Sequence, residues 1–203
     1  RSCFRPAGLK PKDLIGIPWR VAFALQADGW YLRQDIIWSK PNPMPESVTD
    51  RCTKAHEYLF LLTKSAKYHY DAAAIAEDAI KGASGSRFDA GKTALHQLGR
   101  ASDEPRVEST TRNRRSVWTV ATQPFSEAHF ATFPPALIEP CILAGCPKGG
   151  TVLDPFFGAG TTGLVADRHG RKCIGIELNP EYAAIADRRI NADAGMFAKV
   201  AAE

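Results

Sequence analysis

Residues 151–163 decide the fold class, and they read TVLDPFFGAGTTG. Thr151 to Asp154 predict a short strand that runs into a glycine-rich turn. A helix is expected from Thr161 to His169, and a second strand from Lys172 to Glu177. Strand, turn, helix and strand make one β-α-β unit, and such units form parallel sheet. We therefore expect an α/β fold.

A ligand site is expected at the carboxyl end of the first strand, where such units bind their ligands. Gly158 and Gly160 allow a sharp turn and a close approach of backbone to ligand. The helix that begins at Thr161 directs free N–H groups and the positive end of its dipole to the same place. Glu177 ends the second strand 19 residues after Gly158, where an acid accepts both ribose hydroxyls of a nucleoside.

The glycine turn leaves more than one interpretation open. Residues 158–163 satisfy G-x-G-x-x-G, which also occurs in nicotinamide and flavin dinucleotide folds. Such a domain has a further half, whereas 26 residues follow Glu177. Asp154 would repel a pyrophosphate, but it would attract the cationic amino group of S-adenosylmethionine. The carboxylate favours this methyl donor, and the remaining alternative is a structural turn with a helix-capping Asp.

Several segments resemble the amino-methylating DNA methyltransferases, which modify N4 of cytosine or N6 of adenine. Residues 154–162, DPFFGAGTT, resemble their D-P-F-x-G-S-G-T-T motif, with Ala159 in place of the common Ser. Residues 129–134, HFATFP, are similar to their H-x-A-x-F-P segment, which packs on the methionine end of the donor. Residues 36–42 and 56–61 resemble the segments around the target-base pocket.

The resemblance implies a Rossmann-like S-adenosylmethionine-dependent methyltransferase fold with an incomplete sheet, acting on double-stranded DNA in a restriction-modification system. It implies S-adenosylmethionine as cofactor and no metal. The cofactor-binding residues that it implies are Asp154, Phe156, Gly158, Gly160, Thr161, Glu177, Thr132 and Phe133. Cytosine N4 and adenine N6 both stay open as targets.

The order of the segments resembles the permuted beta arrangement of this family, in which the target-pocket half comes first. Residues 1–80 would then form the target-base-pocket half, and residues 116–203 the cofactor-binding half. Residues 81–115 would be a basic target-recognition arm between them. We expect Trp38 and Lys40 to line the base pocket, although a core position for Trp38 is an equal alternative.

The charge distribution supports such an arm. The 203 residues carry a net charge of +4, and residues 81–115 hold eight basic and four acidic side chains. The rest of the chain is therefore neutral, and a basic arm on a neutral body favours nucleic acid as partner. Arg112, Arg114 and Arg115 are expected to contact phosphates. The alternative is that they pair with acids on the body.

The catalytic motif of the family, Ser/Asp/Asn-Pro-Pro-Tyr/Phe, is absent from these 203 residues. Residues 133–136, FPPA, lack a polar leading residue. No catalytic residue is therefore assigned, and Arg1 is expected to mark a truncation that leaves this chain inactive alone. The alternatives are a separate polypeptide that carries the motif, a non-catalytic nucleic-acid-binding remnant, or a methyltransferase of the same fold acting on RNA or protein.

The remaining sequence features are simple. The five cysteines form no C-x-x-C pair, which argues against zinc and favours reduced thiols. No signal peptide or membrane span is recognisable, so we expect a bacterial or phage cytoplasmic protein; a dimer stays open.

Helices are also expected near residues 18–28, 134–144 and 179–190. Residues 57–63 predict an interior strand and residues 68–71 a short edge strand.

Overall fold

The computed structural model describes residues 8–79, 110–123 and 132–194. Its helices are α1 (Ile17–Ala27), α2 (Pro135–Gly145), α3 (Thr161–Arg168) and α4 (Pro180–Ala194). Its strands are β1 (Tyr31–Ser39), β2 (His56–Thr63), β3 (Glu77–Asp78), β4 (Thr111–Arg112), β5 (Val117–Thr119), β6 (Thr151–Asp154) and β7 (Lys172–Gly175). The expected helices and the β-α-β unit β6–α3–β7 are confirmed.

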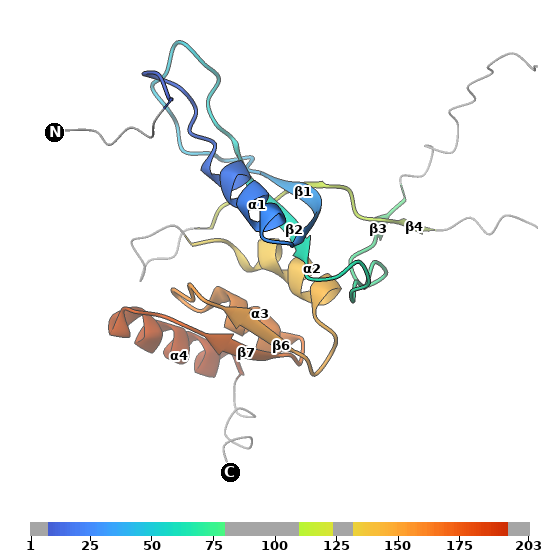
Figure 1. Cartoon of the computed structure of the whole chain (residues 1–203). Coiled ribbons are helices and arrows are strands. Elements are labelled where there is room, and N and C mark those ends of the chain that lie inside the picture. The colour runs from blue at the N-terminus through green and yellow to red at the C-terminus, as the bar shows by residue number, and fades with distance from the viewer. Residues whose placement is uncertain (1–7, 80–109, 124–131, 195–203) are drawn as a thin grey trace, which may run out of the picture.

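The larger sheet has the strand order β2-β1-β5. β1 runs antiparallel to β2, with Tyr31 opposite Thr63 and Ser39 opposite His56, and it is parallel to β5. β6 and β7 form a separate parallel pair. Figure 1 shows β1 and β2 with α1 on one side of α2, and β6, β7, α3 and α4 on the other.

Among the residues that the structure describes, β2 pairs with β1 alone, so it lies at the edge of its sheet and not in the interior position expected for it. Its apolar character has another cause, because both of its faces are covered. Trp19 of α1 packs edge-on against Tyr58 and Phe60, with ring centroids 5.7 and 4.9 Å apart. Leu59 packs on the opposite side against the buried Trp38 cluster.

Helix α2 contributes to two hydrophobic clusters. Leu137 packs with Trp38 and Trp118 beneath the larger sheet. Five residues further on, Ile142 packs with Val165 of α3, and Val152 and Cys173 of the β6–β7 pair lie against this second cluster. α2 therefore joins the two sheets through opposite sides of one apolar helix.

One expected strand and one expected strand boundary are wrong. Residues 68–71 form no strand: the Asp71 N–H donates to the Ala144 carbonyl at 2.9 Å, and the Asp71 carboxylate accepts from the Ala74 N–H. β7 ends at Gly175 rather than Glu177, although the Ile176 N–H still donates to the Asp154 carbonyl at 2.9 Å. Residues 68–71 thus bond to the end of α2, and beyond Gly175 the chain bonds to the end of β6 and to the glycine loop.

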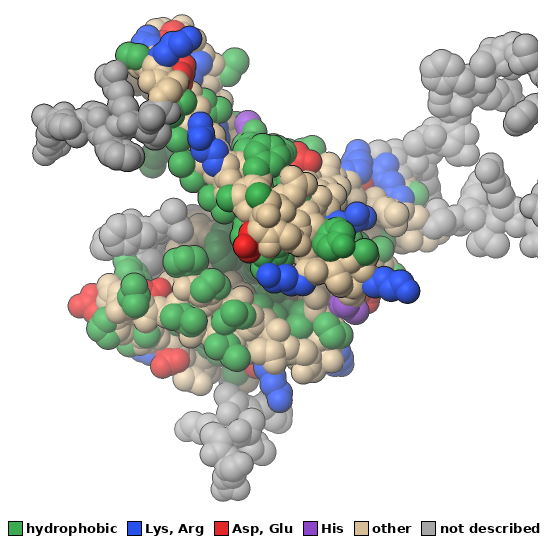
Figure 2. All heavy atoms as spheres, viewed as in Figure 1, with side chains coloured by type: hydrophobic (Ala, Val, Ile, Leu, Met, Phe, Trp, Pro, Cys, Tyr) green, Lys and Arg blue, Asp and Glu red, His purple; other side chains and the backbone are tan. Residues whose placement is uncertain are grey.

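One face of the β6–β7 pair is apolar and open. Leu153, Ile174 and Ile176 are 61, 56 and 51% exposed. β6 pairs with β7 alone among the residues that the structure describes. Figure 2 shows hydrophobic side chains gathered on the near face of this half of the molecule. Within the described ranges, no helix is long and apolar enough to span a bilayer.

Candidate cofactor site

The glycine loop connects β6 to α3. Gly158 and Gly160 have φ angles of +52° and +74°, the left-handed region that glycine tolerates best. Gly160 is the N-cap residue of α3. The Phe157 N–H donates to the Ile176 carbonyl at 2.9 Å, which ties the loop to the chain that leaves β7.

Asp154 holds the loop from the carboxyl end of β6. Its Oδ1 accepts from the Phe156 N–H at 3.0 Å, and its Oδ2 accepts from the Thr162 hydroxyl at 2.6 Å. The carboxylate thereby joins the start of the loop to the first turn of α3. Two carboxylate oxygens offer about four lone pairs, so Asp154 keeps capacity for a further donor.

Glu177 reaches the same loop from the end of β7. Its Oε2 accepts from the Gly158 N–H at 2.7 Å, and its Oε1 accepts from the Asn179 N–H at 2.9 Å. These two backbone donors hold the pKa of Glu177 below its ordinary value. Carboxylates from two strands therefore meet at the glycine loop, as the spacing of Asp154 and Glu177 in the sequence predicts.

The two loop glycines meet different surroundings. A Cβ on Gly158 would have no atom within 4 Å, so this side of the loop is open. A Cβ on Gly160 would lie 2.7 Å from the Cβ of Ala186 in α4. At Gly160 the absence of a side chain therefore lets the loop pack closely against α4.

Thr161 is also directed into the protein. It is 5% exposed, and its hydroxyl accepts from Arg189 Nη1 at 2.9 Å. A contact from Thr161 to a cofactor would have to use its backbone. Sequence reasoning missed Arg189, because nothing in the residue pattern separates it from the other charged residues of α4.

The upstream segment contributes Phe133. It lines a cavity of about 730 Å³ together with Asp154 and Thr162. Phe133 also packs against the Trp38 cluster, and Thr132 beside it is half-buried. Residues 124–131, including His129, lie outside the described part. Phe156, also expected at the cofactor, is 88% exposed.

The residues expected to contact DNA are engaged within the protein. Arg112 and Arg115 both pair with Glu77, at 3.0 and 2.8 Å, as in the alternative interpretation of these arginines. The Arg114 guanidinium lies over the Trp118 ring, 4.8 Å from its centroid. Residues 81–109 of the arm lie outside the described part.

Trp38 and Lys40 form a small unit of their own. Trp38 is 5% exposed, and its indole N–H donates to the Val120 carbonyl at 2.7 Å. Lys40 Nζ lies 4.4 Å from the Trp38 ring centroid and pairs with Glu57. Trp38 is thus a core residue, the alternative that the sequence left open, and Lys40 covers its ring.

Among the described residues, no group of three or more His, Cys, Asp and Glu side chains could hold a metal ion. The described cysteines are Cys52, Cys141, Cys146 and Cys173, and all are free thiols. Burial raises the pKa of the Cys141 thiol to about 11, which makes it a poor nucleophile at neutral pH.

Comparison with solved structures identifies the fold. The PvuII DNA methyltransferase (cytosine-N4-specific) is 22% identical with a TM-score of 0.64, over 90% of this chain and 60% of that one. The M1.HpyAVI-SAM complex is 25% identical with a TM-score of 0.58, over 88% of this chain and 72% of that one. The class is therefore the α/β fold of the S-adenosylmethionine-dependent DNA methyltransferases.

A family model described as DNA methylase matches residues 4–188, and the chain belongs to this N6/N4 methyltransferase family. Type II methyltransferase M.Cfr9I of Citrobacter freundii is 53% identical over 97% of the chain, and 57% of that relative is covered. Type II methyltransferase M.SmaI of Serratia marcescens is 52% identical over 91% of the chain, with 55% of that relative covered. The chain spans somewhat more than half the length of these relatives.

Proposed function

We propose that the intact protein transfers a methyl group from S-adenosylmethionine to an exocyclic base amine of double-stranded DNA. The observation that carries this proposal is the meeting of Asp154 and Glu177 at a glycine loop whose Gly158 side is open. Family membership supports the reaction class, and the named relatives are type II methyltransferases.

The donor groups at the loop suit this cofactor. Glu177 is positioned to accept ribose hydroxyls, and Asp154 can attract the cationic amino group of the methionine end. Phe133, which lines the same cavity as Asp154, and the exposed Phe156 add apolar surface. When bound, S-adenosylmethionine supplies an electrophilic methyl group, and these residues bind and orient it.

We propose residues 81–115 as the DNA contact, between a base-pocket half (1–80) and a cofactor half (116–203). Arg112, Arg114 and Arg115 supply phosphate contacts; in the free protein Arg112 and Arg115 pair with Glu77, and Arg114 lies over Trp118. Lys40 contacts DNA beside the base pocket, while Trp38 supports it from the core. This proposal rests on the net charge of the segment and on the class of the family.

The catalytic Ser/Asp/Asn-Pro-Pro-Tyr/Phe motif is proposed to come from residues beyond these 203, so that this chain alone does not transfer methyl groups. Two observations support this. The motif is absent from the sequence, and the open apolar face of the β6–β7 pair is the kind of surface that parallel sheets cover. A helix can cover this face, and a further strand can pair at the edge of the β6–β7 pair.

Calorimetric titration of the intact protein with S-adenosylmethionine tests the cofactor. Asp154→Asn should weaken this binding about tenfold, because a charge-assisted contact is lost. Binding of 5′-methylthioadenosine, which lacks the amino acid end, should be unchanged and serves as the matched control. Equal losses for both ligands would assign Asp154 to loop structure alone, and tight binding of NAD would overturn the proposal.

Labelled-methyl transfer tests the reaction. The intact protein should label DNA but not RNA or protein, and the label should release as N4-methylcytosine or N6-methyladenine on hydrolysis. The 203-residue chain should stay at background under the same conditions. Transfer by this chain alone would overturn the assignment of the catalytic motif to other residues.

A further inference from the structure

Arg189 of α4 makes contacts on both sides of Gly160. Its Nη1 donates to the Ala159 carbonyl at 3.1 Å and to the Thr161 hydroxyl at 2.9 Å. Ala159 and Thr161 are each 5% exposed, so these bonds lie beneath the loop rather than on its open side. One guanidinium nitrogen therefore fixes the two residues that flank the left-handed Gly160.

A second contact from the same helix acts at the same place. Ala186 lies three residues before Arg189, which is one helical turn, so both side chains project from one side of α4. The Ala186 side chain is 1% exposed, and it leaves no room for a Cβ on Gly160. α4 therefore supports the loop by packing at Gly160 and by hydrogen bonds on either side of it.

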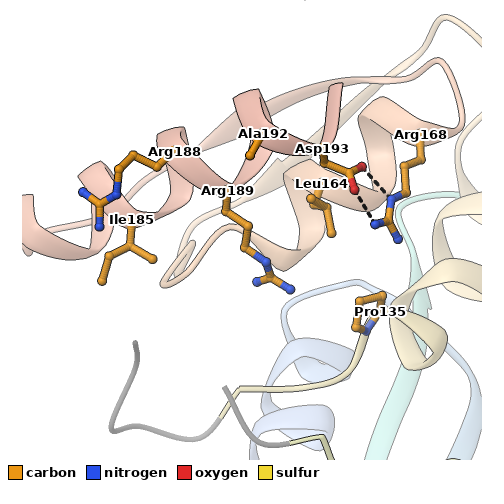
Figure 3. Close-up of a pocket in the computed structure, with 8 residues that line it drawn as sticks. All are labelled: Pro135, Leu164, Arg168, Ile185, Arg188, Arg189, Ala192 and Asp193. Carbon is orange, nitrogen blue, oxygen red and sulfur yellow. Dashed lines mark hydrogen bonds and ion pairs between the residues drawn. The ribbon is translucent and has the colours of Figure 1, made fainter. Parts of the chain in front are cut away.

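The neighbouring arginines are placed differently. Figure 3 shows Arg188 and Arg189 pointing to different sides of α4, and Arg168 turned toward Asp193. Arg168 donates to both carboxylate oxygens of Asp193, at 2.7 and 2.5 Å. Asp193 is thus held by Arg168, while Arg189 reaches the loop and Arg188 stays exposed.

The hydrogen bonds of Arg189 come from a charged, partly buried donor. Desolvation lowers the pKa of Arg189, and the neighbouring Arg168 adds to this effect. A guanidinium stays charged at neutral pH, so its hydrogen bonds are charge-assisted and stronger than neutral ones. Glycines give the loop many accessible backbone conformations, and such a contact holds it in one of them.

We propose that Arg189 is a positioning residue for cofactor binding, which holds the glycine loop in its binding conformation without touching the cofactor. This inference rests on the proposed use of S-adenosylmethionine. Arg189 lies on α4, outside the loop motif. Its role is to control the conformation of the loop rather than to contact the ligand.

The test compares Arg189→Met with Arg188→Met, its exposed neighbour, in the intact protein. Arg189→Met should weaken S-adenosylmethionine binding about tenfold in calorimetry, because preorganised hydrogen bonds from a charged donor are lost. Arg189→Lys, which can still donate, should recover part of this loss. Arg188→Met should bind as the unmodified protein does.

Hydrogen exchange gives a readout that needs no cofactor. Amides of residues 158–162 should exchange faster in Arg189→Met, whereas amides of the Leu137 cluster should not change. Cofactor binding should slow this exchange less in Arg189→Met than in Arg188→Met. Unchanged exchange and affinity in Arg189→Met would overturn the inference, and so would faster exchange throughout the fold, which would mark a general stability role.

The two proposals fail in different ways. If the unmodified protein does not bind S-adenosylmethionine, the proposed function fails, while the exchange experiment still measures the effect of Arg189 on the loop. If the unmodified protein binds and Arg189→Met binds equally well, the positioning role alone is overturned.

Discussion

The backbone N–H of Gly158 donates a 2.7 Å hydrogen bond to Oε2 of Glu177, which joins the glycine loop to the chain that leaves the neighbouring strand. The same carboxylate accepts from the Asn179 N–H at 2.9 Å. Glu177 therefore shapes the edge of the sheet before any ligand arrives. For the proposed cofactor, this carboxylate would be a ribose acceptor whose position the protein has already fixed.

The first prediction concerns the pH dependence of stability at Glu177. Its backbone donors hold the folded-state pKa below the ordinary value of 4.5. The stabilisation is therefore fully present above pH 4.5 and is lost as pH falls through the lower folded-state pKa. The difference in unfolding free energy between the unmodified protein and Glu177→Gln should be constant at neutral pH and shrink in acid.

Urea unfolding at a series of pH values measures this difference. Leu14→Ala, an exposed change that removes no ionisable group, is the control and should show no such pattern. If the difference in unfolding free energy between the unmodified protein and Glu177→Gln grows in acid, the hydrogen-bonding role given to Glu177 is contradicted.

The second prediction separates the two loop glycines. Gly158→Ala should cost about 1–2 kcal/mol, the price of a left-handed backbone in a residue with a Cβ. Gly160→Ala should cost about 1–3 kcal/mol more, because its Cβ would overlap that of Ala186. Thermal unfolding measures both, and Ala186→Gly in the Gly160→Ala background should restore part of the loss. Additive effects of these two changes would argue against the contact.

The third prediction concerns the cluster around α2. Leu137 is 4% exposed and packs against Trp38 and Trp118. Leu137→Ala should destabilise the fold by about 2–5 kcal/mol, through lost burial and a residual cavity. Leu14, which is 86% exposed, offers the same substitution as a control and should change stability by less than about 0.5 kcal/mol. Similar costs at both positions would mean that the described packing is wrong.

The fourth prediction concerns thiol reactivity. Burial raises the pKa of Cys141 to about 11, and its sulfur lies 3.7 Å from the Leu137 carbonyl, whereas Cys52 is exposed. Iodoacetamide at pH 8 should therefore label Cys52 well before Cys141, as peptide mass spectrometry can follow. Labelling of Cys141 should become fast only on denaturation. Equal rates in the native protein would contradict the burial of Cys141.

The fifth prediction concerns the proposed DNA contact. Neutralising Arg112, Arg114 and Arg115 together should reduce the slope of log affinity against log salt by about 0.9 for each phosphate contact removed. Glu77→Gln should strengthen DNA binding, since it releases Arg112 and Arg115 from an ion pair. The control is the double variant Lys148→Gln and Lys172→Gln. Both lysines are exposed, and they lie at the amino ends of β6 and β7. An unchanged slope in the arginine variant would exclude the phosphate role.

Local signals were sufficient for most of the elements. Pro135, Gly160 and Gly170 mark helix ends through backbone preferences that act within a few residues, and the helices lie where those residues predict. The errors share one cause, which is that contacts between distant elements leave no local pattern in the sequence. The apolar pattern of β2 records covered faces, and it does not record whether a strand has one neighbour or two. Residues 68–71 bond to the end of α2, a partner that no local pattern identifies.

The sequence by itself determined the β-α-β unit, the glycine loop and the pair Asp154 and Glu177, because strand, turn and helix preferences act over short distances. Only the tertiary structure decided which groups the loop touches. It turned Thr161 toward Arg189, placed Ala186 beneath Gly160, and buried Trp38 in the core. These contacts join residues 26–30 positions apart or from different elements, so they depend on how the helices pack and leave no periodic trace in the sequence.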